Sequence, residues 1–262
     1  MSKLAVALAA STAVFFGGVA VAADLPARAP IYAPAPVAMF TWTGFYIGGN
    51  VGYHWGEDRS TTAANPIGWT LAGAGAIDAT TPGTSKLSGI TAGGQVGFNY
   101  QIGNFVWGIE GDVNWLGGNK PTRVVTPFTV INPADVFTTS VEPRFMATVR
   151  PRLGVAMDRV LFYVTGGLAI SNARFTDSFG SFGNTDIASV TTSATTLGWT
   201  GGGGLEYAFA NNWSAKFEYL YADFGTINTS IPSCVTCAPG SNITVRHRYI
   251  ENLARVGLNF RF

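Results

Sequence analysis

Five acidic and five basic side chains are the residues of this sequence best placed to do chemistry together, because all fall on polar positions of alternating segments. The acids are Glu110, Asp112, Glu206, Glu218 and Glu251, and the bases are Arg150, Arg152, Lys216, Arg255 and Arg261. In a shared interior they must pair and hydrogen-bond, because an unpaired buried charge is costly. Such a set would act as a gated ion path or proton relay, or as a network that neutralises itself and fills space. The matched numbers favour the second hypothesis.

His54 and His247 are the two histidines of the chain. The alternation points His54 inward near one rim and places His247 just before the last alternating segment. They could therefore meet above the mouth of a barrel as ligands of haem or of a metal ion. Such sites need a cluster of ligands at defined spacing, so two separate polar side chains at a wet rim are the favoured interpretation.

Other catalytic patterns are missing from the sequence. A serine hydrolase would need a nucleophile motif such as G-x-S-x-G, and none occurs. The run Gly201–Gly204 lacks the Lys-Ser/Thr that completes a phosphate loop, and it lies within an alternating segment. We therefore expect no catalytic residue, no metal and no cofactor, and we predict that the protein is not an enzyme.

Cys234 and Cys237 form a Cys-Val-Thr-Cys motif between Pro232 and Pro239. In a redox enzyme this spacing would precede a helix of a βαβ unit, a pattern that does not follow here. An exported chain with two cysteines favours a local disulfide that constrains a loop. So short a ring would add only modest stability.

The elements that must position these side chains are strands, because alternation with a period of two dominates from residue 45 onward. Phe45, Ile47, Val51, Tyr53 and Trp55 share one face of the first segment. Eight segments of about ten residues follow this pattern, and at a tilt near 40° each would span about 25 Å. They begin near residues 45, 90, 105, 145, 162, 197, 213 and 250. In the fourth, Pro151 predicts a lost ladder hydrogen bond or a bulge.

The connections alternate between short and long. Tight turns are predicted at residues 101–104, 157–159 and 210–212, and long loops at roughly 56–88, 116–144, 172–196 and 222–247. Short periplasmic turns opposite long extracellular loops are typical of outer-membrane barrels and put both chain ends in the periplasm. Aromatic residues gather towards both ends of the segments, as expected for rings at a membrane–water boundary. Trp42, Phe105 and Trp213 lie at the short-turn end, and Trp55 and Trp199 at the loop end.

Composition supports the same architecture. Charged residues make up 12% of the chain and aromatic residues 13%, with 33 glycines. A soluble domain usually has about twice that charged fraction. After residue 23 no uninterrupted apolar stretch is long enough for a spanning helix, so a membrane crossing requires a closed barrel. A soluble β-protein is the alternative, but glycines on the polar faces fit the crowded lumen of a narrow barrel. We predict an all-β fold, an eight-stranded antiparallel up-and-down transmembrane barrel with a filled interior.

The N-terminus predicts export. Residues 4–19 are apolar and small, and Ala20-Val21-Ala22 fits the signal-peptidase rule, so residues 1–22 are predicted to be a signal peptide rather than a membrane anchor. Prolines at 26, 30, 34 and 36 make residues 23–41 an extended periplasmic lead, and residues 42–262 form the barrel. Removal of Lys3 leaves 15 basic and 15 acidic residues, which gives no electrostatic case for nucleic acid.

Three segments carry a family resemblance: Trp42-Thr43-Gly44-Phe45-Tyr46-Ile47-Gly48-Gly49-Asn50-Val51-Gly52-Tyr53, residues 216–225 and residues 255–262. Together they resemble small OmpA-like outer-membrane barrels, above all the alphaproteobacterial outer-membrane immunogenic or porin-like proteins. The resemblance implies a Gram-negative outer membrane, contact with its lipid, exposure as a surface antigen and a role in envelope integrity. It also implies that Phe262 serves as the assembly signal read by the barrel-assembly machinery. A narrow porin-like channel and a loop-mediated receptor or adhesin are the alternative functions.

Overall fold

Alternating side chains build one closed sheet in the computed structural model, which describes residues 40–64, 83–118, 122–125, 135–181, 188–231 and 242–262. The strands are β1 (Gly44–Ala64), β2 (Gly83–Ile102), β3 (Phe105–Leu116), β4 (Thr122–Val125), β5 (Asp135–Met157), β6 (Val160–Ser181), β7 (Ala188–Tyr207), β8 (Trp213–Ile231) and β9 (Ile243–Arg261). The predicted signal peptide, residues 23–39 of the lead, and Cys234 with Cys237 lie outside the described residues. Among those residues, no helix is long and apolar enough to cross a membrane.

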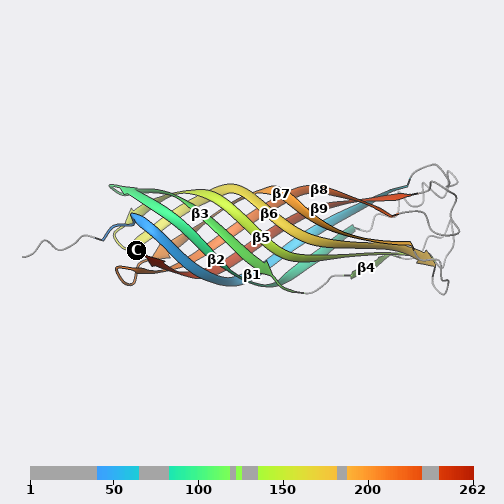
Figure 1. The fold of residues 1–262 in the computed structure, drawn as a ribbon, viewed down its shortest axis with the longest axis horizontal. Coiled ribbons are helices and arrows are strands. Elements are labelled where there is room, and N and C mark those ends of the chain that lie inside the picture. The colour runs from blue at the N-terminus through green and yellow to red at the C-terminus, as the bar shows by residue number, and fades with distance from the viewer. Residues whose placement is uncertain (1–39, 65–82, 119–121, 126–134, 182–187, 232–241) are drawn as a thin grey trace, which may run out of the picture. The chain divides into compact units, whose positions relative to one another are not determined.

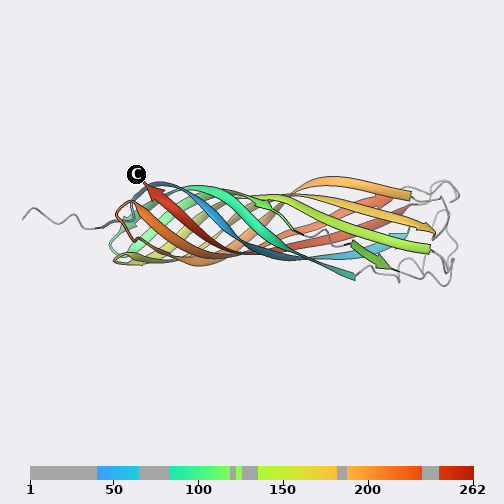
Figure 2. The ribbon, with the colours of Figure 1, turned by 90° about the horizontal axis from the view of Figure 1, so that it is seen from below.

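Eight long antiparallel strands close the barrel, because β3 pairs with β2 on one side and with β5 on the other. The short β4 is an addition that pairs only with the outer part of β5 (Figure 2). The strands wind around the barrel, with the C-terminus at the end that carries the tight turns (Figure 1). The predicted eight-stranded antiparallel barrel is thereby confirmed.

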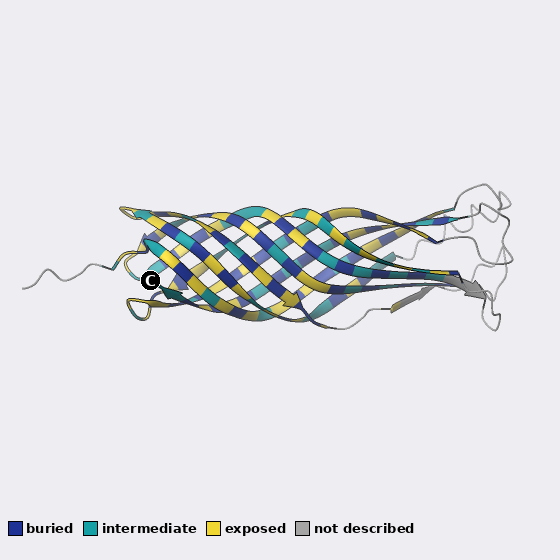
Figure 3. Cartoon of the chain, in the orientation of Figure 1, coloured by how far each residue is buried: buried dark blue, intermediate teal, exposed yellow. Residues whose placement is uncertain are grey.

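Two zones along the strands differ in what they bury. We call the zone from the tight turns to the level of Trp55, Trp115, Phe145 and Trp199 the short-turn half, and the rest the loop half. In the short-turn half, apolar side chains face outward, as Val96 and Leu153 do at 57% and 59% exposure. Inward residues alternate with them and are buried, which produces the chequered pattern of Figure 3. This zone follows the alternation predicted from the sequence.

The predicted strand length is wrong, since the eight barrel strands run for 12 to 23 residues. Much of the sequence predicted to be long loops is strand: β1 continues to Ala64 and β6 to Ser181. The reason is a change of phase. In β6, Leu168 and Ile170 face outward, whereas Ala173 and Phe175, further along the same strand, are buried inside. A sequence pattern with one continuous apolar face therefore ends where the apolar residues move from the outward to the inward face of the strand.

The loop half divides into two four-stranded sheets, β2–β1–β9–β8 and β4–β5–β6–β7. Pairing of β7 with β8 ends at Trp199↔Asp223, although β6 still pairs with β7 and β8 with β9 beyond that level. A bulge after Asp223 turns β8 away from β7, and Gly225 adopts a left-handed φ of 69° within it. The N–H of Gly225 donates to Asp223 Oδ1 at 2.8 Å and fixes the turn.

The inner faces of these two sheets enclose an apolar core within residues 40–262, which form one unit. Phe175 and Val141 come from one sheet, and Leu87 and Tyr249 from the other, all with at most 1% exposure. A second cluster follows towards the loops, with Phe137, Ile231, Ile243 and Val245. The loop half therefore has the interior of a water-soluble β-sandwich.

Pro151 removes ladder contacts without shifting the register. β5–β6 pairing is interrupted between Val149↔Leu168 and Arg152↔Thr165, and both pairs belong to the same register. The Thr165 hydroxyl donates to the Pro151 carbonyl at 2.8 Å. Of the two predicted outcomes, the lost ladder contact is therefore the one found, and the bulge in β5 lies between Pro143 and Phe145 instead.

Candidate functional site

Arg255 lies at the centre of a buried ion network in the short-turn half. β9 points its guanidinium into the lumen, where Nη1 and Nη2 donate to the two carboxylate oxygens of Asp112 at 3.0 and 3.1 Å. Its Nε donates to Glu218 Oε2 at 2.8 Å. Asp112 comes from β3 and Glu218 from β8, so one arginine ties three strands together across the barrel. This fork geometry is the strongest form of a charge-assisted hydrogen bond.

Arg150 and Lys216 complete the same layer. Arg150 Nη2 donates to Asp112 Oδ2 at 2.7 Å and to Glu110 Oε1 at 2.8 Å. Lys216 Nζ donates to both oxygens of Glu110 at 2.9 Å. Each carboxylate is thereby shared between cations from different strands, so the charges neutralise one another as a group rather than as isolated pairs.

Arg152 and Glu206 form a second layer, closer to the tight turns, with Arg152 Nη2 donating to Glu206 Oε2 at 2.9 Å. The Arg152 guanidinium also lies 3.8 Å from the centroid of the Tyr163 ring. Tyr46 links the layers, because its hydroxyl donates to Glu110 Oε2 at 2.8 Å and accepts from Arg152 at 3.1 Å. Gly97 makes room for Tyr46, since a Cβ there would lie 2.3 Å from the hydroxyl oxygen.

Neutral polar side chains add further hydrogen bonds to the network, and a sequence pattern of ionisable groups alone does not identify them. Asn259 Nδ2 donates to Glu206 at 2.8 Å, and Gln95 Nε2 donates to Asn259 at 2.8 Å. Thr148 and Tyr163 donate to Asp112 and Glu218. The signal was present in the sequence, because all of these residues occupy the same polar faces as the charges.

Arg261 departs from the prediction. Its guanidinium lies at the short-turn mouth, where Nη2 donates to the Asn211 carbonyl at 2.6 Å and the group packs over the rings of Phe40 and Trp42. Among the described residues it forms no ion pair with a carboxylate of the network. Arg261 immediately precedes the C-terminal residue and lies at the water-exposed end of the barrel, so water partly hydrates its charge.

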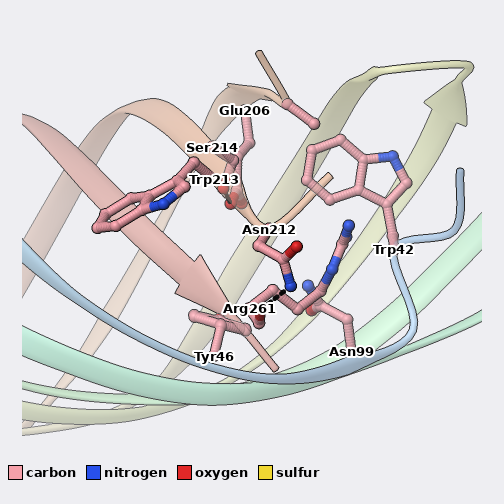
Figure 4. A pocket seen from close by; sticks show the side chains of 9 residues that line it. Trp42, Tyr46, Asn99, Glu206, Asn212, Trp213, Ser214 and Arg261 are labelled. Carbon is pink, nitrogen blue, oxygen red and sulfur yellow. Dashed lines mark hydrogen bonds between the residues drawn. The ribbon is translucent and has the colours of Figure 1, made fainter. Parts of the chain in front are cut away.

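Trp42 closes that mouth from inside and is 1% exposed, whereas the sequence predicted it among the aromatic residues of the membrane boundary. Its indole Nε1 donates to the Asp158 carbonyl at 3.3 Å. Figure 4 shows Trp42, Arg261, Asn212 and Glu206 around a small cavity of about 10 Å³, the size of a single water site. Trp42 therefore occupies the barrel mouth just before β1 begins.

Glu251 is also separate from the network, against the prediction. It is fully buried near the boundary of the two halves, where it lies 3.3 Å from His54 Nδ1 and accepts from the Tyr249 hydroxyl at 2.7 Å. His54 Nε2 in turn lies 2.7 Å from the carbonyl oxygen of Gly117. His54 points inward as predicted, but its partners are Glu251 and the end of β3.

His247 lies within β9, inside the loop half, and contacts two carboxylates from different strands instead of His54. Nδ1 is 2.9 Å from Asp58 Oδ2, and Nε2 is 3.2 Å from Asp177 Oδ2. Thr139 and Thr229 donate to Asp177 at 2.7 and 2.6 Å. Since Asp177 and Thr139 belong to one sheet and the other residues to the second, this cluster joins the two sheets through their apolar core.

Electrostatics favour a charged imidazole at this position. Burial alone would lower the pKa of His247, but the hydrogen bonds and charges of Asp177 and Asp58 raise it to about 9. Burial raises the pKa of Asp58 more than His247 lowers it. Burial would also raise the pKa of Asp177, but the hydrogen bonds from His247, Thr229 and Thr139 outweigh burial and hold this pKa below its ordinary value.

The geometry of these clusters fits a structural role better than a reaction. An Asp–His pair can serve as a general base, but His247, Asp58 and Asp177 are all 0% exposed, so no substrate reaches them. Within the described residues, no group of three or more His, Cys, Asp or Glu side chains could hold a metal ion. In the short-turn half, the eight ionised residues that meet across the lumen are between 0% and 4% exposed.

Sequence comparison finds relatives over almost the whole chain. Residues 4–262 match the family model for the outer membrane protein beta-barrel domain. The 31 kDa outer-membrane immunogenic protein of Brucella melitensis is 34% identical, covering 97% of this chain and 98% of the relative. The 22 kDa outer membrane protein of Rhizobium leguminosarum bv. viciae is 28% identical, covering 85% and 79%.

Solved structures show a similar architecture at low sequence identity. The outer membrane protein OprG from Pseudomonas aeruginosa matches with a TM-score of 0.45 at 12% identity, covering 84% of this chain and 97% of that one. The outer membrane protease OmpT from Escherichia coli matches with a TM-score of 0.44 at 8% identity, covering 87% and 99%. Neither likeness is close enough to carry a functional argument.

Proposed function

The chain belongs to the outer membrane protein beta-barrel family, and from this premise we propose that it is a sealed, non-catalytic barrel that holds the loop half at the cell surface. As in its named relatives, its place is the outer membrane of a Gram-negative bacterium. The short-turn half, with its apolar exterior, is the part that contacts lipid. The loop half, with its polar exterior, stands above the membrane and supplies the exposed surface.

The network around Arg255 is the observation that carries the proposal of a sealed lumen. An ion path needs mobile water in the lumen and charged side chains that are free to pair with a passing ion. Here Asp112 and Glu110 are each shared between two cations at 2.7 to 3.1 Å, and Glu206 accepts from Arg152 at 2.9 Å. A barrel of eight strands encloses only enough space for its own side chains. The network therefore contributes to envelope integrity by making the barrel rigid and impermeable.

Planar-bilayer recording of the purified protein tests the seal. We expect no discrete conductance steps from the wild-type chain, because the interior charges are paired. The double variant D112A/R255A removes the central pair and opens a path for water, so it should conduct. The outward variant V96A is the matched control and should stay silent. Stable single-channel steps from the wild-type protein would contradict the proposal and favour the narrow porin-like channel.

Recognition of a ligand or a host surface is a second candidate function. The observation that favours it is the two-sheet core of the loop half, which extends the strands well beyond the aromatic level. Replacing the connection between β6 and β7 with a short glycine-serine turn would test it. If recognition is the function, the variant barrel should keep its heat-dependent gel mobility and lose binding to the ligand or to host cells.

Export and assembly belong to the same proposal. Residues 1–22 act as the signal peptide and residues 23–41 as the periplasmic lead, so intact-mass measurement of the outer-membrane protein should give a chain that starts at residue 23. Phe262 serves as the signal for the barrel-assembly machinery. Its ring is 76% exposed while its N–H donates to the Phe45 carbonyl at 3.0 Å, which leaves the side chain free for recognition. Deleting Phe262 should lower the yield of membrane-integrated barrel.

A further inference from the structure

Four basic side chains face outward on one sheet of the loop half, on β2, β1 and β9. We call this group, Arg59, Lys86, Arg246 and Arg248, the cation patch. The side chains of Arg59 and Arg248 are 62% and 57% exposed. The carboxylates among them are those of Glu57, 3.3 Å from Arg59, and Asp223, 3.1 Å from Arg248. Four cations against two carboxylates leave a local excess of positive charge.

The arrangement of these cations is unfavourable in the isolated protein. Arg59 and Arg248 are direct cross-strand partners in the β1–β9 register, so two like charges lie side by side. Like charges placed opposite each other destabilise a sheet. Lys86 lies opposite Glu57, which is already paired with Arg59. Within the described part of the chain, Arg246 has no carboxylate at ion-pair distance. An anion at the patch would relieve this repulsion.

A groove begins directly beneath the patch on the outer surface. It lies at the seam where β7 and β8 separate, has a volume of about 510 Å³ and is open to the outside. Leu168, Leu197 and Trp199 form its apolar part, and Arg248 and Asp223 line its polar end. The bulge with Gly225 creates the groove, because it takes β8 away from β7 at this level.

The groove crosses the level of the boundary aromatic residues and reaches the patch at Arg248, which belongs to both. The ring of Trp55 lies 6.3 Å from that of Tyr53 and 6.0 Å from that of Tyr219, centroid to centroid. Trp55 marks the level at which the outward apolar residues of β1 end. Arg59 follows four residues later on the same face, which is about 13 Å along the strand and less along the membrane normal because strands tilt. The polar headgroup layer of a bilayer extends about 5–8 Å beyond the hydrocarbon on each side, so the patch begins at its outer edge.

We propose that the cation patch and the groove together bind a phosphate-bearing glycolipid of the outer leaflet. The phosphate monoesters accept hydrogen bonds from Arg248 and Arg59, and one acyl chain lies in the groove against Leu168, Leu197 and Trp199. Arginine suits this task because its planar fork matches phosphate oxygens. A free phosphate ion shares the headgroup chemistry but would make no use of the groove. This inference does not depend on whether the lumen is sealed.

Native mass spectrometry of the full mature chain in zwitterionic detergent tests the site. The probes are diphosphorylated lipid A, the same lipid with both phosphates removed, and inorganic phosphate. The wild-type protein should bind the diphosphorylated lipid at least tenfold more tightly than either of the other two. The variant R59Q/R248Q should lose about 10- to 30-fold of that affinity, because each cation near an anionic surface contributes roughly a factor of five.

Arg144 provides the matched control, since it is an exposed arginine on β5 in the other sheet. R144Q should bind the diphosphorylated lipid as the wild-type protein does, and all variants should keep heat-dependent gel mobility. Equal binding of the phosphorylated and dephosphorylated lipids would overturn the proposal. So would unchanged affinity in R59Q/R248Q. If inorganic phosphate bound as tightly as the lipid, the groove would have no role and the lipid assignment would be wrong.

Discussion

The two halves of this barrel bury opposite kinds of side chain: charged ones in the short-turn half and apolar ones in the loop half. In the short-turn half, charges such as Arg255 and Asp112 are buried inside, and Val96 and Leu153 face outward. In the loop half, Phe175 and Tyr249 are buried inside, and polar residues such as Thr191 and Arg248 face outward. The same continuous strands carry both arrangements, because β6 and β9 pass from one half into the other.

The difference shows that the solvent outside, and not the strand itself, decides which side chains are buried. Lipid accepts apolar side chains without penalty, so a narrow lumen can be filled with polar groups if all of them are paired. Where water surrounds the strands, stability comes from removing apolar surface from it, at about 25 cal/mol per Å². The phase change between Ile170 and Ala173 marks the membrane surface in the sequence.

Breaking the interior of the short-turn half should have the largest effect. R255M leaves Asp112 and Glu218 without their main partner, and loss of one member of a buried ion pair costs about 3–5 kcal/mol. Urea unfolding in lipid vesicles, followed by gel mobility, measures this change. R248M removes an exposed arginine from the same strand and should change stability by less than about 0.5 kcal/mol. Equal effects of R255M and R248M would contradict the assignment of Arg255 to the network.

The interior of the loop half should respond to loss of apolar volume. Phe175 is fully buried between the two sheets, and F175A should cost about 3 kcal/mol through lost burial and the cavity left behind. Because the membrane-embedded strands do not depend on this core, gel mobility should stay that of a folded barrel. The rate of amide hydrogen exchange should rise in the parts of β8 and β9 that belong to the loop half. Loss of the whole barrel in F175A would show that the two halves are not separable.

An arginine placed on the outer surface distinguishes the two halves, because lipid surrounds one half and water surrounds the other. L153R puts an arginine on the lipid face, where it should cost about 2–3 kcal/mol near the midplane. T195R puts the same side chain on the exposed face of β7 in the loop half, where about 0.5 kcal/mol or less is expected. Folding efficiency into vesicles reports both. A similar cost at the two positions would mean that the loop half also contacts lipid.

The sequence predicts one half far better than the other. Alternation and composition identify the strands of the short-turn half, and polar-face positions identify eight of the ten network residues. Which charge meets which could not be predicted, since Arg255 and Asp112 are 143 residues apart and meet only through the closed register. The sequence pattern predicts loops where the structure has the strands of the loop half, because the apolar residues there change face. Trp42 was misplaced because no periodicity links the lead to the barrel mouth.

The titration of His247 confines a pH response to the loop half. With a folded pKa of about 9 above an ordinary value of 6.5, His247 stabilises the joined sheets fully below pH 6.5 and progressively less as pH rises towards 9. The raised pKa of Asp58 acts in the same direction at lower pH. The lowered pKa of Asp177 acts oppositely, and its contribution is lost as pH falls below its ordinary value of 3.8.

The loop half should therefore loosen by about 2–3 kcal/mol between pH 6.5 and 9, seen as faster hydrogen exchange around Val245. H247Q should remove this dependence, because it keeps a polar side chain but no titrating charge. The strands around Arg255 should exchange equally slowly at both pH values, and an unchanged profile in H247Q would show that the bridge between the sheets does not depend on the imidazole charge.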